Sequence, residues 1–149
     1  MERAPDNCIF CEILAGRAPA SIIHNDQVCL ALLTIGPVTT GHTLVIPKRH
    51  AAYLADLDEE TGAHLFRVTM RLAQAIRQSG LRCEGINVFL ADGEAAFQDV
   101  FHVHLHVFPR YQGDPFRIEA DWTMKPPREE LDWIAHQIRS SYQALWGSG

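Results

Sequence analysis

Apolar residues along the chain follow two spacings, one typical of helices and one typical of strands. Between residues 58 and 79 they recur at steps of three and four, and Gly80 follows the last of them. This spacing predicts one long amphipathic helix that ends at the glycine. A second stripe of the same spacing predicts a C-terminal helix over residues 128–146. The apolar positions of the first stripe are Leu65, Val68, Leu72 and Ile76.

Shorter apolar runs, bounded by turn-forming residues, predict strands. The run at 21–33 is interrupted by His24-Asn25-Asp26, which indicates a hairpin of two strands. The apolar residues near the N-terminus suit a short helix that is stopped by Gly16 and Pro19. Further strands are expected at 43–47, 85–91 and 100–108.

These elements together predict an α+β fold. We expect an antiparallel sheet of about five strands, one long central helix and a C-terminal helix. The chain has 149 residues, of which 47% are hydrophobic, and this is enough for one domain with its own core. We therefore expect a single domain over residues 1–149, with a core at 8–110 and a helical extension at 128–146.

Charge and hydropathy argue against several classes of function. The net charge is −5 and no run of like charges occurs, so no nucleic-acid polymer is expected as a partner. No stretch approaches the roughly 20 apolar residues of a membrane span. The N-terminus also lacks the charged and apolar regions of a signal peptide. We expect a cytoplasmic protein with no membrane partner, and a pocket for a small ligand is compatible with this charge.

The cysteines fall into two kinds. Cys8 and Cys11 form a C-x-x-C pair, which inside cells points to metal or redox chemistry sooner than to a structural disulfide. Cys29 and Cys83 lie singly within apolar segments, and we expect them to be buried as small hydrophobic side chains.

Three histidines occupy alternate positions in the segment at 100–108. Alternate side chains of a strand share a face, so His102, His104 and His106 are expected to point the same way. Val103, Leu105 and Val107 would then face the opposite layer. Three buried imidazoles need three sets of hydrogen bonds, which makes a purely structural role costly. Such a strand can supply ligands of a catalytic zinc, or it can carry a nucleophilic imidazole with its neighbours as orienting groups and proton donors, and the strand alone leaves both open.

The segment "HVHLHVF" resembles the alternating histidine signature of the histidine triad family of nucleotide hydrolases and transferases. The segments "CIFCEILAGRAP" and "GHTLVIPKRH" are similar to the N-terminal segment and the central strand of that family. The resemblance implies that His104 is the nucleophile that attacks the α-phosphate of a nucleoside phosphoramidate, dinucleotide or similar ester. It also implies that His106 contacts the phosphate, that His42 is the fourth active-site histidine, and that Gln98 belongs to the phosphate loop.

One branch of the family holds a structural zinc ion, and the resemblance extends to its ligands. The matching positions are Cys8, Cys11, His50 and His102. Two cysteines and two histidines form a closed tetrahedral set, which is typical of a structural rather than a catalytic zinc site. The family commonly forms homodimers, so a homodimer is expected here as well.

Several substrate-contacting positions depart from the family pattern. Thr34 replaces a ribose-binding Asp or Asn, Ala91 replaces an Asn or Gln, and Phe97 replaces a Gly. Asp99 stands where a Ser or Thr usually binds the phosphate, and its carboxylate would repel an anion unless it is protonated or turned away. Either the substrate differs from a simple purine nucleotide, or Asp99 has a new role, for which pairing with an imidazole is one candidate. Asn87 is a further candidate for substrate binding. The apolar positions of the base pocket are kept, and they are Ile9, Phe10, Ile13, Leu32 and Ile35.

These departures leave a second hypothesis open, a non-catalytic nucleotide- and zinc-binding module that retains the fold. A third hypothesis has the three histidines of the triad hold a hydrolytic zinc ion together. The third hypothesis predicts that His104→Ala loses its metal ion, and the first predicts that His104→Ala loses activity.

Overall fold

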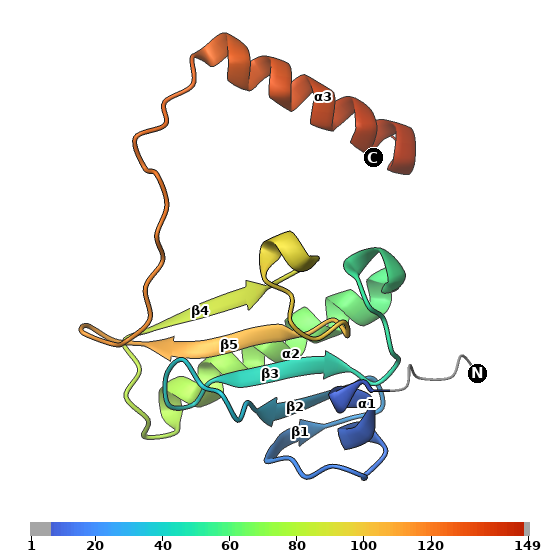
Figure 1. The fold of residues 1–149 in the computed structure, drawn as a ribbon, viewed down its shortest axis with the longest axis vertical. Helices are drawn as coiled ribbons and strands as arrows, with labels where there is room; N and C mark the ends of the chain where they lie inside the picture. Colours follow the sequence, from blue (N-terminus) through green and yellow to red (C-terminus); the bar gives the residue numbers. More distant parts are fainter. Residues whose placement is uncertain (1–6, 148–149) are drawn as a thin grey trace. The chain divides into compact units, whose positions relative to one another are not determined.

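The computed structural model describes residues 7–147, and Figure 1 shows their helices and strands. In chain order these are α1 (Ile9–Leu14), β1 (Ile22–Asn25), β2 (Cys29–Leu33), β3 (Thr43–Pro47), η1 (Leu54–Asp56), α2 (Glu59–Gln78), β4 (Gly85–Leu90), η2 (Glu94–Ala96), β5 (Leu105–Arg110) and α3 (Arg128–Trp146).

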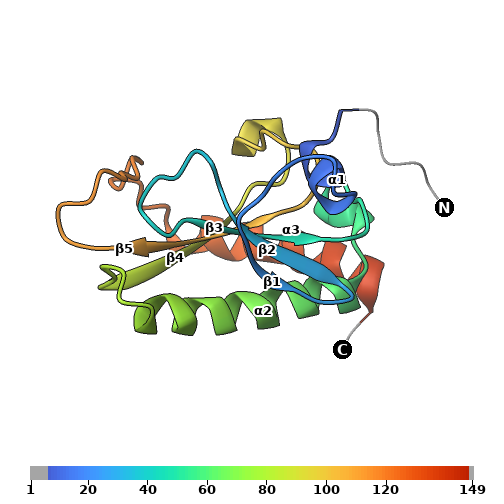
Figure 2. The same cartoon turned by 90° about the horizontal axis from the view of Figure 1, so that it is seen from below.

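The five strands form one sheet in the order β1-β2-β3-β5-β4, and each neighbouring pair is antiparallel. The long helix α2 connects β3 to β4 and lies along one face of the sheet, whereas α1 and η2 lie on the other side (Figure 2). The expected α+β fold is therefore confirmed, together with the hairpin and the long helix.

The start and end of α2 follow from its terminal residues. Asp58 is the N-cap, and its Oδ1 accepts a hydrogen bond from the Thr61 N–H at 2.9 Å. Gly80, which follows the C-cap Ser79, has a φ of +85°, a conformation that glycine adopts with little strain.

The sheet has apolar side chains on both faces. On one face the stripe of α2 packs against Val103, Leu105 and Val107, as the alternation of the histidine segment predicts. On the other face Phe10 of α1 packs against side chains of β2 and β3. Phe10 also contacts the rings of His102 and His104, so these two imidazoles lie on the face opposite α2.

The strand that was expected at 100–108 is shorter at its start and longer at its end. It begins at Leu105, because the backbone before it turns, with the His102 N–H donating to Val100 O and the Val103 N–H donating to Ala51 O. It continues through Pro109. On the β3 side, the Pro109 carbonyl accepts a hydrogen bond from Thr39 Oγ1. The pairing of β5 with β3 has already ended at Val107, so the N–H that proline lacks is not needed for a bond to β3.

The chain divides into two compact units, one ending at Phe116 and one starting at Arg117. The second unit contains α3, whose predicted bounds are confirmed and none of whose residues is buried. The expected single domain over residues 1–149 stays a prediction. Within residues 7–147, no helix combines the length and apolar character that crossing a membrane would require.

Candidate active site and metal centre

His102 is fully buried at the centre of the site, and its partners fix its tautomer. Its Nε2–H donates to the carbonyl of Pro47, at the end of β3, over 2.8 Å. The other nitrogen, Nδ1, therefore carries a lone pair. It lies 3.4 Å from Cys8 Sγ and 3.6 Å from Cys11 Sγ, so the lone pair faces the cysteine pair of α1.

His50 completes a cluster of four metal-binding side chains. Its Nδ1 lies 3.4 Å from Cys11 Sγ and 3.2 Å from His102 Nδ1. A tetrahedral zinc site with Zn–S of about 2.3 Å and Zn–N of about 2.0 Å places N and S about 3.5 Å apart and two N about 3.3 Å apart. The observed spacings match this geometry, so the cluster could hold a metal ion. The four predicted residues, brought together from α1, the segment after β3 and the segment before β5, are Cys8, Cys11, His50 and His102.

The hydrogen bonding of His104 leaves one of its ring nitrogens without a proton. The side chain is 3% exposed, and its Nδ1–H donates to the carbonyl of His102 over 2.8 Å. Nε2 therefore carries the lone pair, as a nucleophilic imidazole requires. The same His102 residue thus joins the metal cluster through its ring and orients His104 through its backbone.

His42 and His106 form a chain of hydrogen bonds beside His104. The Val38 N–H donates to His42 Nδ1 at 3.1 Å, so the His42 proton sits on Nε2 and donates to His106 Nδ1 at 2.9 Å. His106 consequently keeps its proton on Nε2, where it is available as a donor. The ring centroids of His104 and His106 are 4.8 Å apart, which places this donor next to the candidate nucleophile.

Burial keeps this pair of histidines uncharged. It lowers the pKa of His106 to about 4, with smaller contributions from His104 and His42, and it lowers the pKa of His42 as well. A neutral imidazole at this position donates a hydrogen bond without carrying a charge.

We expect stability to fall as the pH drops from about 6.5 to about 4. In this range the histidine of the unfolded chain takes up a proton, whereas the half-buried His106 of the folded chain stays neutral because its pKa is lower, so acid favours unfolding. Urea unfolding at pH 7 and pH 5 should show this loss in the wild type. In His106→Gln the loss should be smaller, by roughly tenfold in the folding equilibrium constant. Identical pH dependences of the two proteins would contradict the assignment.

Asp99 lies directly in front of the candidate nucleophile. Its Oδ1 is 3.6 Å from His104 Nε2 and also accepts the Val100 N–H at 2.9 Å. The side chain is 80% exposed, so the carboxylate remains hydrated. Pairing of this carboxylate with an imidazole is one of the two explanations that the sequence left open for Asp99, and the structure identifies His104 as the imidazole that it faces.

The chain is also similar to known proteins that carry the same histidine motif. The family model of the HIT domain matches residues 15–113. The chain belongs to the HIT domain family. It is 44% identical over 139 residues to an uncharacterised HIT-like protein of Mycobacterium tuberculosis, covering 92% of this chain and 96% of that one.

A solved structure and an enzyme of the HIT domain family are also similar. A zinc-bound histidine triad family protein of Mycobacterium smegmatis is 45% identical with a TM-score of 0.70, covering 91% of this chain and 97% of that chain. The adenosine 5′-monophosphoramidase of Schizosaccharomyces pombe is 33% identical over 135 residues, covering 90% and 97%. Proteins of this family are in general nucleotide-binding hydrolases or transferases.

Two of the expected HIT substrate residues are engaged elsewhere. The Gln98 amide is buried and bonds backbone groups. Its Nε2 donates to Ala52 O and Val100 O, and its Oε1 accepts from the Gly93 N–H. Asn87 Oδ1 accepts from Arg110 at 2.6 Å. These two amides therefore brace the protein in this structure, and their role in substrate binding stays a prediction.

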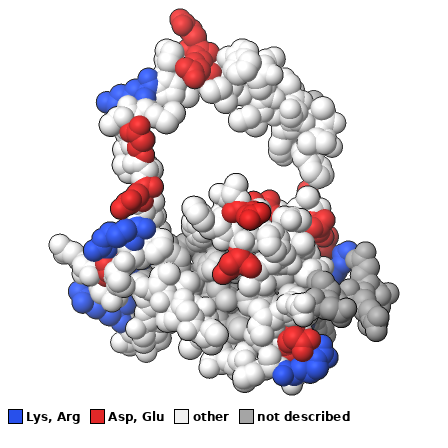
Figure 3. All heavy atoms as spheres, viewed as in Figure 1, with Lys and Arg blue, Asp and Glu red and all other residues white. Residues whose placement is uncertain are grey.

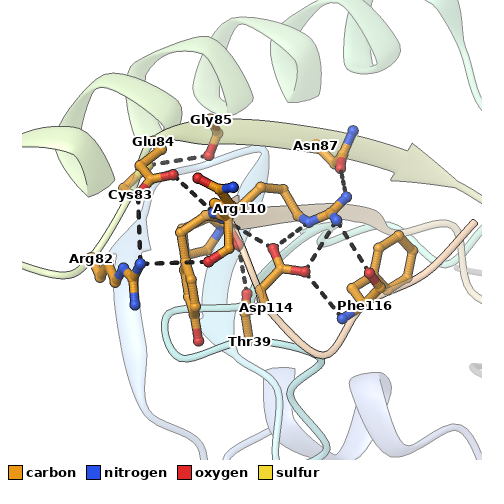
Figure 4. Close-up of polar contacts among 12 residues, drawn as sticks. Thr39, Arg82, Cys83, Glu84, Gly85, Asn87, Arg110, Asp114 and Phe116 are labelled. Carbon is orange, nitrogen blue, oxygen red and sulfur yellow. Dashed lines mark hydrogen bonds and ion pairs between the residues drawn. The ribbon is translucent and has the colours of Figure 1, made fainter.

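Figure 4 shows the network that contains Asn87. Arg110 pairs with the buried Asp114 at 2.6 Å and donates to the carbonyl of Phe116. This pairing lowers the pKa of Asp114 to about 2. Sequence reasoning missed this network, which holds the segment after β5 to the end of the sheet.

The predicted base-pocket residues differ in exposure. Phe10 and Leu32 are buried, Ile13 is half-buried, and Ile9 and Ile35 are exposed. Thr34 Oγ1 accepts the N–H of Gly36, so its hydroxyl shapes the loop after β2. Phe97 is exposed with a φ of +66°, the left-handed conformation that the glycine of this family position adopts freely. Ala91 is buried and offers no polar group.

Proposed function

We propose that this HIT protein is a nucleotidyl hydrolase or transferase in which His104 forms a covalent nucleotidyl intermediate. The observation that carries the proposal is the hydrogen bond from His104 Nδ1 to the His102 carbonyl, because it leaves the Nε2 lone pair free to attack. Nucleophilic catalysis of this kind splits one difficult displacement into two easier steps.

In the first step His104 Nε2 forms a bond to the α-phosphorus, and the bond from phosphorus to the leaving group breaks. The leaving group takes up a proton from water at the exposed side of the site. In the second step a water molecule attacks the phosphorus and breaks the bond to nitrogen. It releases the nucleoside monophosphate and one proton, which balances the proton taken up before. With another acceptor in place of water the outcome is transfer.

We propose that His42 and His106 stabilise the phosphate of the substrate. The Nε2–H of His106 is oriented by His42 and would donate to a phosphoryl oxygen as negative charge develops there. Because His106 is neutral, it acts through a hydrogen bond rather than as a cation.

The metal of the four-residue cluster is proposed to be a structural zinc ion. The donor set of two thiols and two imidazoles, and its near-tetrahedral spacing, fit zinc. Zinc there would supply a cross-link between α1, the segment after β3 and the segment before β5. The chain's own contribution is the Pro47 carbonyl, which turns His102 Nδ1 toward the cysteines.

We further propose that the preferred substrate is a phosphoramidate with an amine leaving group. The S. pombe relative is an adenosine monophosphoramidase. The Asp99 carboxylate, 3.6 Å from the attacking nitrogen, would repel the anionic leaving group of a dinucleoside polyphosphate and would accept a hydrogen bond from an amine.

Asp99→Ser is therefore expected to shift the preference toward dinucleoside polyphosphates. The ratio of kcat/KM for diadenosine polyphosphate to that for adenosine phosphoramidate should rise roughly fivefold, a modest change because an exposed carboxylate is screened by water. Glu94→Gln is the matched control, since it removes an exposed carboxylate from η2 and should leave the ratio unchanged. An unchanged ratio in Asp99→Ser would contradict the proposal.

Two alternatives to this proposal are a non-catalytic binding module and a triad that holds a metal ion with three ligands. Intact-protein mass spectrometry after mixing with adenosine phosphoramidate separates the enzyme from a non-catalytic binding module. The enzyme gains the mass of one nucleotidyl group on His104, and the module gains none. The triad as a three-ligand metal site is not supported, since among the described residues the two candidate metal clusters include neither His104 nor His106.

A further inference from the structure

A second cluster of metal-binding side chains lies on the α2 side of the sheet, away from the triad. It is built on the turn between β1 and β2, where Asp26 is the central residue. Asp26 Oδ1 accepts the N–H groups of Val28 and Cys29 at 2.8 and 2.9 Å, so the carboxylate is held rigidly. These bonds leave the other oxygen, Oδ2, to side chains alone.

Three side chains converge on this Oδ2 oxygen. His24 Nε2 lies 2.7 Å from it, and His64 Nε2 of α2 lies 2.8 Å from it. Cys29 Sγ, which is fully buried, lies 3.6 Å away. The donor atoms of His24, Asp26 and Cys29 all lie within 4.8 Å of one another.

The spacing of these donors suits a tetrahedral ion. With Zn–S of about 2.3 Å and Zn–O of about 2.0 Å, S and O lie about 3.5 Å apart, close to the observed distance. The distance between His24 Nε2 and Asp26 Oδ2 would have to widen by about 0.5 Å to bracket an ion. The His24 side chain is 41% exposed, so it has room to make this adjustment.

We propose that His24, Asp26 and Cys29 form a second binding site for zinc or a similar transition-metal ion. One imidazole, one carboxylate and one thiolate are the ligands that zinc accepts, and the thiolate disfavours magnesium and calcium. His64 positions the site by donating to the ligating carboxylate, as partners of metal-bound carboxylates commonly do. A water molecule would complete the coordination of the ion.

Protons balance in a simple way when the ion binds. The Cys29 thiol loses its proton to solvent and binds as a thiolate. His24 binds through Nε2, so the proton of that nitrogen moves to Nδ1 through solvent. His64 keeps its Nε2–H and its hydrogen bond to Asp26.

A competing explanation for the cluster is a metal-free clamp. Two histidines donating to one carboxylate would tie the hairpin turn to α2 without any ion. In the clamp the Cys29 thiol keeps its proton and donates a third hydrogen bond to Asp26 Oδ2. In the metal site the same sulfur is a deprotonated ligand, so only there does bound metal depend on Cys29. Cys29 therefore separates the two explanations.

The test is a cobalt titration of the full chain, freed of metal and reduced beforehand. Cobalt replaces zinc in tetrahedral sites, and its charge-transfer absorbance reports bound thiolates. Bound cobalt per chain is measured after equilibrium dialysis for the wild type, Cys29→Ala and His24→Gln. Cys83→Ser is the matched control, because Cys83 is a half-buried cysteine whose Sγ contacts Arg77 and Gly85 and belongs to neither cluster.

We expect Cys29→Ala and His24→Gln each to bind about one equivalent less than the wild type, and Cys83→Ser to bind as much as the wild type. This loss is measured against the wild-type total, so it is seen whether or not the cluster of Cys8 and Cys11 also binds cobalt. Circular dichroism checks the fold, and the half-exposed His24 can be replaced with little disturbance to the core. Equal cobalt in the wild type, Cys29→Ala and His24→Gln would overturn the proposal.

Discussion

Replacing His104 with alanine is expected to abolish turnover of adenosine phosphoramidate, with a loss on the order of 10³-fold or more in kcat. The nucleophile forms the bond to phosphorus, and no other group can take over this step. His106 is nearby, but its Nδ1 accepts from His42 and its Nε2 carries a proton, so it has no free lone pair. The substrate should still bind, because the neighbouring donors are kept.

Stopped assays and intact-mass spectrometry should show the loss of both product and nucleotidyl adduct in His104→Ala. His136→Ala, which removes an exposed histidine of α3, is the control and should retain wild-type turnover. Product release by His104→Ala at the wild-type rate would exclude the covalent mechanism. If the wild type itself gave neither product nor adduct while still binding nucleotide, the non-catalytic module would be the correct function.

Local patterns were sufficient to predict most of the fold. The spacing of apolar residues gave α2 within a residue at each end, because Asp58 and Gly80 determine its ends through local hydrogen bonds and φ values. The start of β5 could not be predicted in this way. It depends on the contact of Val103 with Ala51, which are far apart in the sequence.

The candidate site shows a similar division. The resemblance predicted which histidines and cysteines lie together, since the family motif specifies residue types at fixed positions. It did not predict the tautomers of the histidines, because these depend on backbone partners such as Pro47 O and Val38 N–H. Gln98 illustrates the limit, since its position matches the motif while its amide bonds the loop around it.

The distribution of charge along the sequence did not predict which side chains contact one another in the folded protein. On the face drawn in Figure 3, the charged side chains of the described residues lie in small separate groups, in keeping with the absence of charge runs in the sequence. A net charge of −5 did not reveal that Asp99 faces His104. It also did not reveal that Asp26 lies between two histidines, one of which belongs to α2.

Removal of zinc from the cluster of Cys8 and Cys11 is expected to lower the melting temperature by roughly 10 °C. An ion that binds only the folded chain adds about 3–4 kcal/mol when its concentration is 100–1,000 times Kd. Each kcal/mol corresponds to about 2–4 °C in a chain of this size. Turnover should fall as well, since the cluster holds His102, whose carbonyl orients His104.

Calorimetry with and without a chelator measures the shift in the Cys29→Ala background, so that the second proposed site does not contribute. Cys11→Ser in the same background should remove the bound zinc and the effect of the chelator, whereas Cys83→Ser should change neither. Less than about half an equivalent of zinc in protein prepared without chelator, together with an unchanged melting temperature, would show that the cluster is not a metal centre. His102 would then orient His104 through the Pro47 hydrogen bond alone, and activity would be independent of zinc.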